Sequence, residues 1–188
     1  MKRIFVLLSV AIALNVAPAR AIIMRHDVPD WRYVQLGDHV RGPLVQLGLP
    51  AEEDHAPMLY SGMGTLIAPD WVITAAHAAE YMQQNPPANG AAQYVYYKGR
   101  GYQVAAIILH PQYDADHYTN DIALIHLARP VRAPEAACLY ERTDEVGRTV
   151  TLVGSGYAGT GRDGPREDPD GRVRGATVAV GAMIAHPA

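Results

Sequence analysis

The chain has 188 residues, of which 49% are hydrophobic, and this is enough to bury a substantial core. Its formal net charge is −3 and it contains no block of basic residues, which argues against a nucleic-acid partner. With 17 glycines and 14 prolines, turn signals are frequent, and this favours an all-β fold over a helical one.

Residues 1–21 have the three parts of a secretory signal peptide. Lys2 and Arg3 form a short positive region, an apolar run follows over 4–14, and Ala19-Arg20-Ala21 offers a small-x-small cleavage site. The apolar run is short for a membrane span, so we expect a cleaved leader rather than an anchor. The sequence therefore predicts an exported protein, secreted or periplasmic, with no membrane attachment after cleavage.

The remaining chain reads as short strands separated by turns. Segments rich in Val, Ile, Thr and Tyr, several of them alternating in polarity, predict strands at 42–48, 65–67, 71–74, 94–97, 102–109, directly after Asp121, at 149–154 and at 173–179. A helical turn is expected over 78–82, and the Gly-, Asp- and Arg-rich stretch 158–172 is expected to be a surface loop. Residues 22–38 give no clear pattern.

The most distinctive stretch is 62–77, which reads Gly-Met-Gly-Thr-Leu-Ile-Ala-Pro-Asp-Trp-Val-Ile-Thr-Ala-Ala-His. Two β-rich segments flank the turn Ala68-Pro69-Asp70, and the stretch ends at His77. It resembles the catalytic-histidine motif of the trypsin-like serine proteases, in which a glycine pair and a hydrophobic strand precede Trp-Val-Leu-Thr-Ala-Ala-His.

A second motif begins at His110 and reads His-Pro-Gln-Tyr, followed after a short loop by Asn-Asp-Ile-Ala-Leu at 120–124. It resembles a pair of motifs in the same family, His-Pro-x-Tyr and then Asn-Asp-Ile-Ala-Leu, whose aspartate is catalytic. Asp121 stands at that position. His77 and Asp121 are 44 residues apart, close to the spacing in the family, so two motifs agree in order and in distance.

This resemblance implies an all-β, trypsin-like double β-barrel, with the N-terminal barrel complete and the C-terminal barrel only begun. The domains expected are a signal peptide at 1–21, the N-terminal barrel at 22–135, and a connector with the first strands of the second barrel at 136–188. The implied activity is that of a serine endopeptidase acting on polypeptide substrates through an acyl-enzyme. His77 would be its general base and Asp121 the carboxylate that orients it. No cofactor or metal is expected, because the sequence has no His-Glu-x-x-His or Cys-x-x-Cys motif.

The family's nucleophile stands in Gly-Asp-Ser-Gly-Gly, and this sequence contains no such motif. We therefore expect no nucleophile in these 188 residues and interpret the chain as a fragment. Ser155, in Gly-Ser-Gly, is a weak substitute, because a nucleophile elbow needs Gly-x-Ser-x-Gly between a strand and a helix. The alternatives are a non-catalytic binding module on the same scaffold and a split enzyme completed by a second chain.

Three further features each allow two interpretations. Cys138, the single cysteine, is expected to be a buried small hydrophobe or to have a partner beyond residue 188. Asp114, Asp116 and His117 share one loop, where a solvated loop is favoured over a cation site. Ile22 follows the cleavage site, and the resemblance suggests either an activating N-terminus made by signal cleavage or an ordinary mature N-terminus, which is the interpretation we favour.

Overall fold

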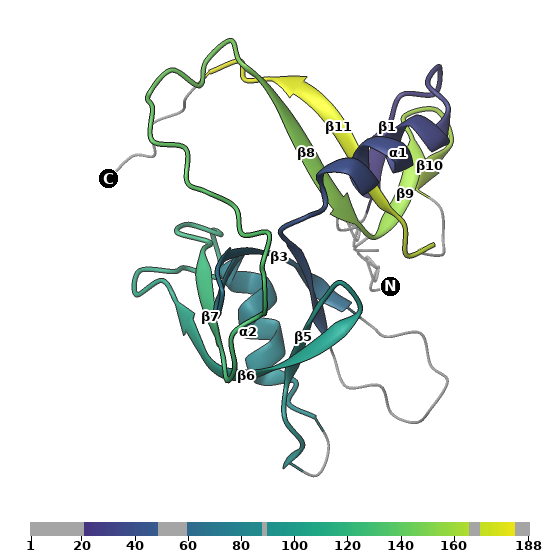
Figure 1. The fold of residues 1–188 in the computed structure, drawn as a ribbon. Coiled ribbons are helices and arrows are strands. Elements are labelled where there is room, and N and C mark those ends of the chain that lie inside the picture. The colour runs from purple at the N-terminus through teal and green to yellow at the C-terminus, as the bar shows by residue number, and fades with distance from the viewer. Residues whose placement is uncertain (1–20, 49–59, 88–89, 166–169, 183–188) are drawn as a thin grey trace, which may run out of the picture.

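The computed structural model describes residues 21–48, 60–87, 90–165 and 170–182. The chain forms two parts (Figure 1). One is a β-barrel against which helix α2 packs, and the other, beside it, consists of two small sheets with helix α1. Apart from its last residue, the predicted signal peptide lies outside the described residues. Neither helix in these ranges has the length and apolar character that a membrane crossing needs.

Six antiparallel strands close the barrel in the order β2-β3-β4-β7-β6-β5. Their bounds are β2 (Leu44–Gly48), β3 (Tyr60–Ala68), β4 (Trp71–Thr74), β5 (Tyr94–Tyr97), β6 (Arg100–Leu109) and β7 (Ala123–Leu127). Helix α2 (Ala76–Gln84) follows β4 directly and packs against the barrel. The predicted all-β architecture with one complete barrel is confirmed, and the helical turn expected at 78–82 belongs to this longer helix.

Alternation along the strands builds the barrel core. In β2, Val45 and Leu47 are buried while their neighbours Leu44 and Gln46 are half-buried, as the sequence predicts. The same pattern recurs in β7, where Ile125 is fully buried. Each such side chain removed from water contributes roughly 2 kcal/mol to folding. The core therefore sits inside the barrel and holds its strands in one register.

A two-residue turn joins β5 to β6. Lys98 and Gly99 both have positive φ, 48° and 77°, and Tyr97 pairs with Arg100 across the turn. Two left-handed residues between paired strands make the tight hairpin whose twist matches that of the sheet. The turn fixes the position of Arg100 at the beginning of β6.

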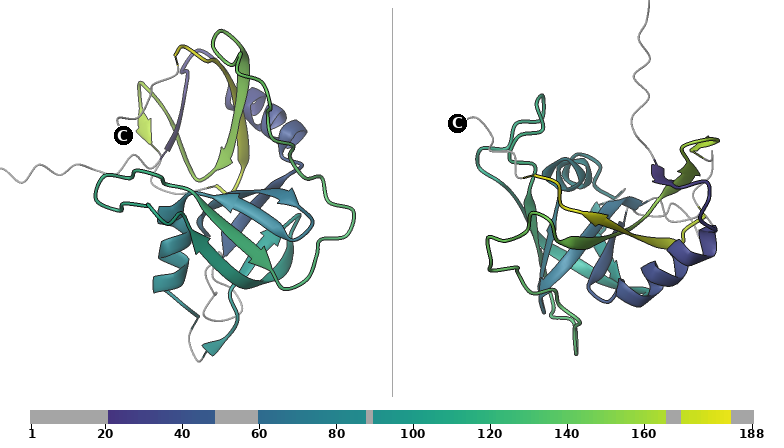
Figure 2. Two further views of the ribbon diagram at one scale, coloured as in Figure 1. Left: turned by 90° about the vertical axis from the view of Figure 1, so that its left-hand side faces the viewer. Right: turned by 90° about the horizontal axis from the view of Figure 1, so that it is seen from above.

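The second part brings together both ends of the described chain. Strand β8 (Thr149–Ser155) pairs with β11 (Val173–Ala179), and β1 (Ala21–Met24) joins β9 (Tyr157–Thr160) and β10 (Gly164–Pro165). Helix α1 (Asp30–Val40) packs on β11, as two further views show (Figure 2). Strand β1 and helix α1 thus contact the C-terminal strands more than they contact the barrel. The domain boundaries expected at 22–135 and 136–188 stay predictions.

The close approach of α1 to β11 depends on two glycines. A Cβ at Gly37 would lie 2.6 Å from the carbonyl oxygen of Val173 and 2.8 Å from Cα of Arg174. A Cβ at Gly175, on the strand, would lie 3.0 Å from the backbone nitrogen of Gly37. The helix can lie this close to the strand only because both positions lack a side chain.

Three expectations differ from the structure. Stretch 158–172, expected to be only a surface loop, includes the end of β9 and the short strand β10, which pair antiparallel. Helix α1 was not predicted, because its apolar residues follow a weak helical pattern and Gly37 interrupts it. Cys138 is exposed rather than buried, since it lies in the irregular connector after the barrel.

Candidate active site

His77 lies where strand β4 passes into helix α2. Thr74 is the last residue of β4, and its hydroxyl donates to the carbonyl of Met63 on β3 at 2.9 Å. Ala75 is the N-cap residue of α2 and His77 lies in its first turn. The small residues Ala76, Ala78 and Ala79 are buried, so the helix packs closely and directs the 54%-exposed His77 side chain outwards.

Asp121 reaches the same end of the barrel from the segment just before β7. Thr74 pairs with Ala123, so the residues after β4 and those before β7 lie side by side. Asn120, with φ 52°, turns the chain just before Asp121, and its side chain donates to the carbonyl of Gln112 at 2.9 Å. Antiparallel pairing of β4 with β7 thus brings together two motifs that are far apart in sequence.

The Asp121 carboxylate contacts His77 twice. Its Oδ2 lies 2.7 Å from Nδ1 of the His77 ring, and its Oδ1 accepts the backbone N–H of His77 at 2.8 Å. An ionised carboxylate can only accept, so the proton between ring and carboxylate belongs to Nδ1. In the neutral ring, Nε2 is then the nitrogen without a proton, and it is free to accept one.

The second contact also caps helix α2. Ala75 has no side chain that can accept a hydrogen bond from the first turn, and helix starts with such orphan N–H groups are stabilised by a carboxylate. Asp121 supplies this carboxylate from the segment before β7. Partial burial raises the pKa of Asp121, but hydrogen bonds from His77 and from the backbone of Ala76 outweigh this, so its pKa is lowered overall.

On its other side the His77 ring meets Tyr118 edge-on, with ring centroids 5.7 Å apart. Tyr118 is itself exposed and has positive φ, 52°, in the loop between β6 and β7. His77 is therefore held by one carboxylate and bordered by one aromatic ring, with a face open to solvent. This arrangement suits a group that must exchange a proton with a substrate.

Ser155, the weak substitute for a nucleophile, contacts a different residue. Its backbone N–H and hydroxyl lie 2.9 and 3.2 Å from Sδ of Met63. It is half-buried at the end of β8, and the chain continues into β9 rather than into a helix. The structure thus gives Ser155 a packing environment and not the strand-to-helix turn of a nucleophile elbow.

The remaining candidates form local contacts. Asp114 pairs with His117 at 2.8 Å, and its Oδ1 accepts the backbone N–H groups of Asp116 and His117, as in an ordinary turn. His126 on β7, a further histidine of the barrel, stacks on Trp71 with ring centroids 4.5 Å apart. Over the described ranges, no three His, Cys, Asp or Glu side chains are grouped so that they could hold a metal ion.

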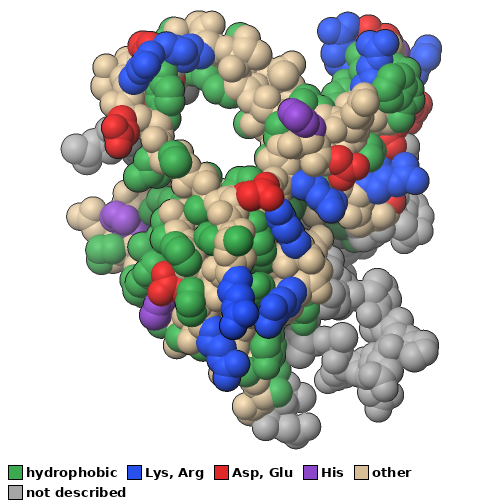
Figure 3. Space-filling model, viewed as in Figure 1, with side chains coloured by type: hydrophobic (Ala, Val, Ile, Leu, Met, Phe, Trp, Pro, Cys, Tyr) green, Lys and Arg blue, Asp and Glu red, His purple; other side chains and the backbone are tan. Residues whose placement is uncertain are grey.

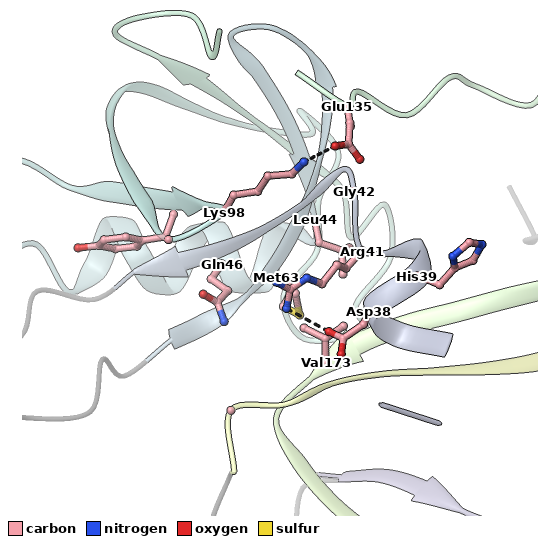
Figure 4. Close-up of a pocket in the computed structure, with 13 residues that line it drawn as sticks. Asp38, His39, Arg41, Gly42, Leu44, Gln46, Met63, Lys98, Glu135 and Val173 are labelled. Carbon is pink, nitrogen blue, oxygen red and sulfur yellow. Dashed lines mark hydrogen bonds and ion pairs between the residues drawn. The ribbon is translucent and has the colours of Figure 1, made fainter. Parts of the chain in front are cut away.

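A cavity of about 470 Å³ separates the barrel from α1 and β11 (Figure 4). Its charged side chains pair with one another. Lys98 bonds Glu135 on one wall, and Arg41 lies 3.2 Å from Asp38 on the other. Because these charges are mutually satisfied, the cavity presents little net charge to a ligand.

Comparison with known proteins identifies the same family that the two sequence motifs resemble. The sequence matches the family model described as Trypsin over residues 51–180, which is more than half of the chain. The chain belongs to the trypsin family. Both motif residues, His77 and Asp121, fall within the matched region.

Curated members of the family include a trypsin of Simulium vittatum, 32% identical over 120 residues, and a trypsin of Phaedon cochleariae, 34% identical over 110 residues. These matches cover 62% and 51% of this chain, and 47% and 41% of the relatives. The chain therefore spans about half the length of the curated trypsins it matches.

Solved structures of similar fold include neuropsin, a serine protease expressed in the limbic system of mouse brain, and a structure titled GrC. The TM-scores are 0.57 and 0.55, with 21% identity in both cases. Each match covers 77% of this chain, and 61% and 62% of the other chain. At this level of identity the likeness concerns the fold.

Proposed function

We propose that the protein acts in proteolysis as an exported, trypsin-like serine endopeptidase, with His77 as general base and Asp121 as the carboxylate that positions it. The observation that carries the proposal is the double contact of Asp121 with His77, 2.7 Å to the ring and 2.8 Å to the backbone. It fixes both the tautomer and the direction of the ring, which are the two properties that a serine protease needs of its histidine.

In the proposed reaction, Nε2 of His77 takes the proton of a serine hydroxyl as the oxygen attacks the scissile carbonyl carbon. The tetrahedral intermediate collapses when the imidazolium returns that proton to the leaving nitrogen, and the C–N bond breaks. Water then hydrolyses the acyl-enzyme with the same base. Asp121 stays ionised throughout and stabilises the imidazolium, which agrees with its lowered pKa.

The proposal needs a serine that the Gly-Asp-Ser-Gly-Gly motif would identify, and the 188 residues contain no such motif. The serine must therefore come from further polypeptide, either continuous with this chain or separate from it. The other possibility, a non-catalytic binding module, would keep the backbone contact of Asp121 as the cap of α2 but would give its contact with the His77 ring no catalytic use. Export through residues 1–21 and the domain boundary near 135 are part of the same proposal.

The test is to isolate the protein from its native source, measure its intact mass, and treat it with a fluorophosphonate that labels activated serines. We expect a mass above that of the 188 residues, or a bound second chain, together with labelling. In the recombinant equivalent, His77→Ala should abolish labelling, whereas His117→Ala, at an exposed histidine of the neighbouring loop, should not. A native protein that consists of these residues alone and takes no label would favour the binding module.

A further inference from the structure

A second cavity, of about 660 Å³, lies against the barrel and is strongly basic. Three arginines, Arg100, Arg129 and Arg132, line it together with Tyr94, Tyr102 and Gln103, and none of its lining residues is acidic. Lys and Arg side chains gather over the lower barrel in the space-filling view (Figure 3). In a chain of net negative charge, such a local concentration of cations needs an explanation.

The arginines of this cavity have no carboxylate partner among the described residues. Arg25, Arg148 and Arg174 each bond an aspartate. Arg100 instead lies over the ring of Tyr102, 5.6 Å from its centroid. Within the described ranges, the side chains of Arg129 and Arg132 form no hydrogen bond or ion pair. Three exposed guanidinium groups are thus available to an anion from outside.

The backbone beneath these arginines is fixed. Ala128 donates to the carbonyl of Gln103 at 2.9 Å, and Val131 donates to that of Pro69 at 2.7 Å. The side chain of Val131 is buried in the barrel core, so the turn that carries Arg129 and Arg132 is anchored at its centre. Arg100 is held by the tight hairpin. Binding of a ligand therefore needs to order only the arginine side chains and not the backbone that carries them.

The cavity is distant from the proposed catalytic pair. Strand β6 passes Gln103 at the cavity and ends at Leu109, which pairs with Ala123 beside Asp121. At about 3.3 Å per residue, these two ends of the strand are roughly 20 Å apart. This is a distance that six or seven residues of extended polypeptide would cover, so one chain could reach both places.

We propose that the cavity of Arg100, Arg129 and Arg132 is a docking site for an acidic segment of a polypeptide substrate. That the bound segment belongs to a substrate rests on the proposed proteolytic function. The binding of an acidic segment to the cavity does not depend on that function. Arginine binds carboxylates through paired N–H groups. The exposed ring of Tyr94 and the half-buried ring of Tyr102 offer apolar surface to the side chains between the acids.

The experiment uses the His77→Ala form of the full chain, so that proteolysis cannot intervene. Fluorescence anisotropy measures the binding of a labelled peptide rich in Asp and Glu, and of the matched peptide with Asn and Gln. We expect only the acidic peptide to bind, with an affinity that falls as salt is raised. The double variant Arg129→Gln/Arg132→Gln should weaken this binding by about tenfold or more.

The matched control is Arg142→Gln/Arg162→Gln, which removes the same charge at exposed arginines outside the cavity. Equal weakening by both double variants would overturn the proposal, because binding would then follow net charge alone. Binding of heparin through the cavity without binding of the acidic peptide would overturn it in favour of a polysaccharide site. Thermal denaturation of each variant checks that the fold is kept. Fluorophosphonate labelling tests the catalytic proposal separately.

Discussion

Arg174 and Asp30 are 144 residues apart in sequence and form a two-bond ion pair, with distances of 2.7 Å from Nε to Oδ1 and 3.0 Å from Nη2 to Oδ2. The guanidinium is buried, with 1% of its side chain exposed, and also bonds both carboxylate oxygens of Asp170. Asp30 begins helix α1 and Arg174 lies in β11. This pair therefore ties the N-terminal helix to the C-terminal sheet.

Replacing Arg174 by Met should destabilise this part of the molecule by about 3 kcal/mol, because two partly buried carboxylates would lose their shared cation. Hydrogen–deuterium exchange should become faster in α1 and β11 and stay unchanged in the barrel strands. Arg162→Met, at an exposed position, is the control. Unchanged protection of α1 in the Arg174 variant would mean that the ion pair does not hold the helix.

The same cluster should make the second part sensitive to acid. Arg174 holds the pKa of Asp170 well below its ordinary value of 3.8. A carboxyl with a lowered folded pKa contributes stability that is present above the unfolded pKa and is lost as pH falls through the folded value. Exchange protection of β11 should therefore decline as pH falls below about 4. Because Arg174→Met removes the largest cause of the lowered pKa of Asp170, a decline of the same steepness in that variant would refute the assignment.

Gly37→Ala should destabilise the protein although alanine is the better helix former. On an exposed helix this change stabilises by up to about 1 kcal/mol. Here the new Cβ would lie 2.6 Å from the backbone of β11, so we expect a net loss of about 2 kcal/mol in urea denaturation. Gln35→Ala, at an exposed position of the same helix, should be neutral or slightly stabilising. A stabilising Gly37→Ala would show that α1 is not packed this closely.

Asp121→Ala should cost about 1 kcal/mol of stability, the usual value of a lost helix cap. The effect should be local, with faster amide exchange at His77, whose N–H bonds Asp121. Asp116→Ala, in the exposed loop, is the comparison, since the Asp116 side chain caps nothing in the described structure. If the two variants exchange alike at His77, the capping role of Asp121 is wrong.

Asp121→Asn should reverse the tautomer of His77 while the cap is kept. The amide oxygen can still accept the His77 N–H, but the amide nitrogen then faces Nδ1 and donates to it, so the ring proton moves to Nε2. The ¹⁵N chemical shifts of the ring in mildly alkaline buffer report this exchange. Asp114→Asn, beside His117, should leave the His77 signals in place. Ring nitrogens that keep their shifts in Asp121→Asn would contradict the assigned proton position.

Much of the barrel could be predicted from the sequence, because its information is local. Alternation in β2 and β7, the Ala-Pro-Asp turn before β4 and the Lys-Gly turn after β5 each act within a few residues. The two motifs at His77 and Asp121 are also local patterns, and the trypsin family follows from them. Of the cavity arginines, Arg129 and Arg132 lie close together in the sequence, on either side of Pro130-Val131. No local pattern indicates that Arg100 lies beside them.

Other features depend on residues that only the tertiary fold brings together. The cap of α2 comes from Asp121 because β4 pairs with β7, whereas the N-cap residue Ala75 has no side-chain group that could accept a hydrogen bond. Helix α1 has a weak apolar pattern and a glycine at its centre, and it is stabilised by Arg174 and by close contact with Gly175. The sequence by itself determined the strands and turns of the barrel and the chemical types at the site. The tertiary structure decided which of these groups meet, because hydrogen bonds and ion pairs depend on distance in space and not on distance along the chain.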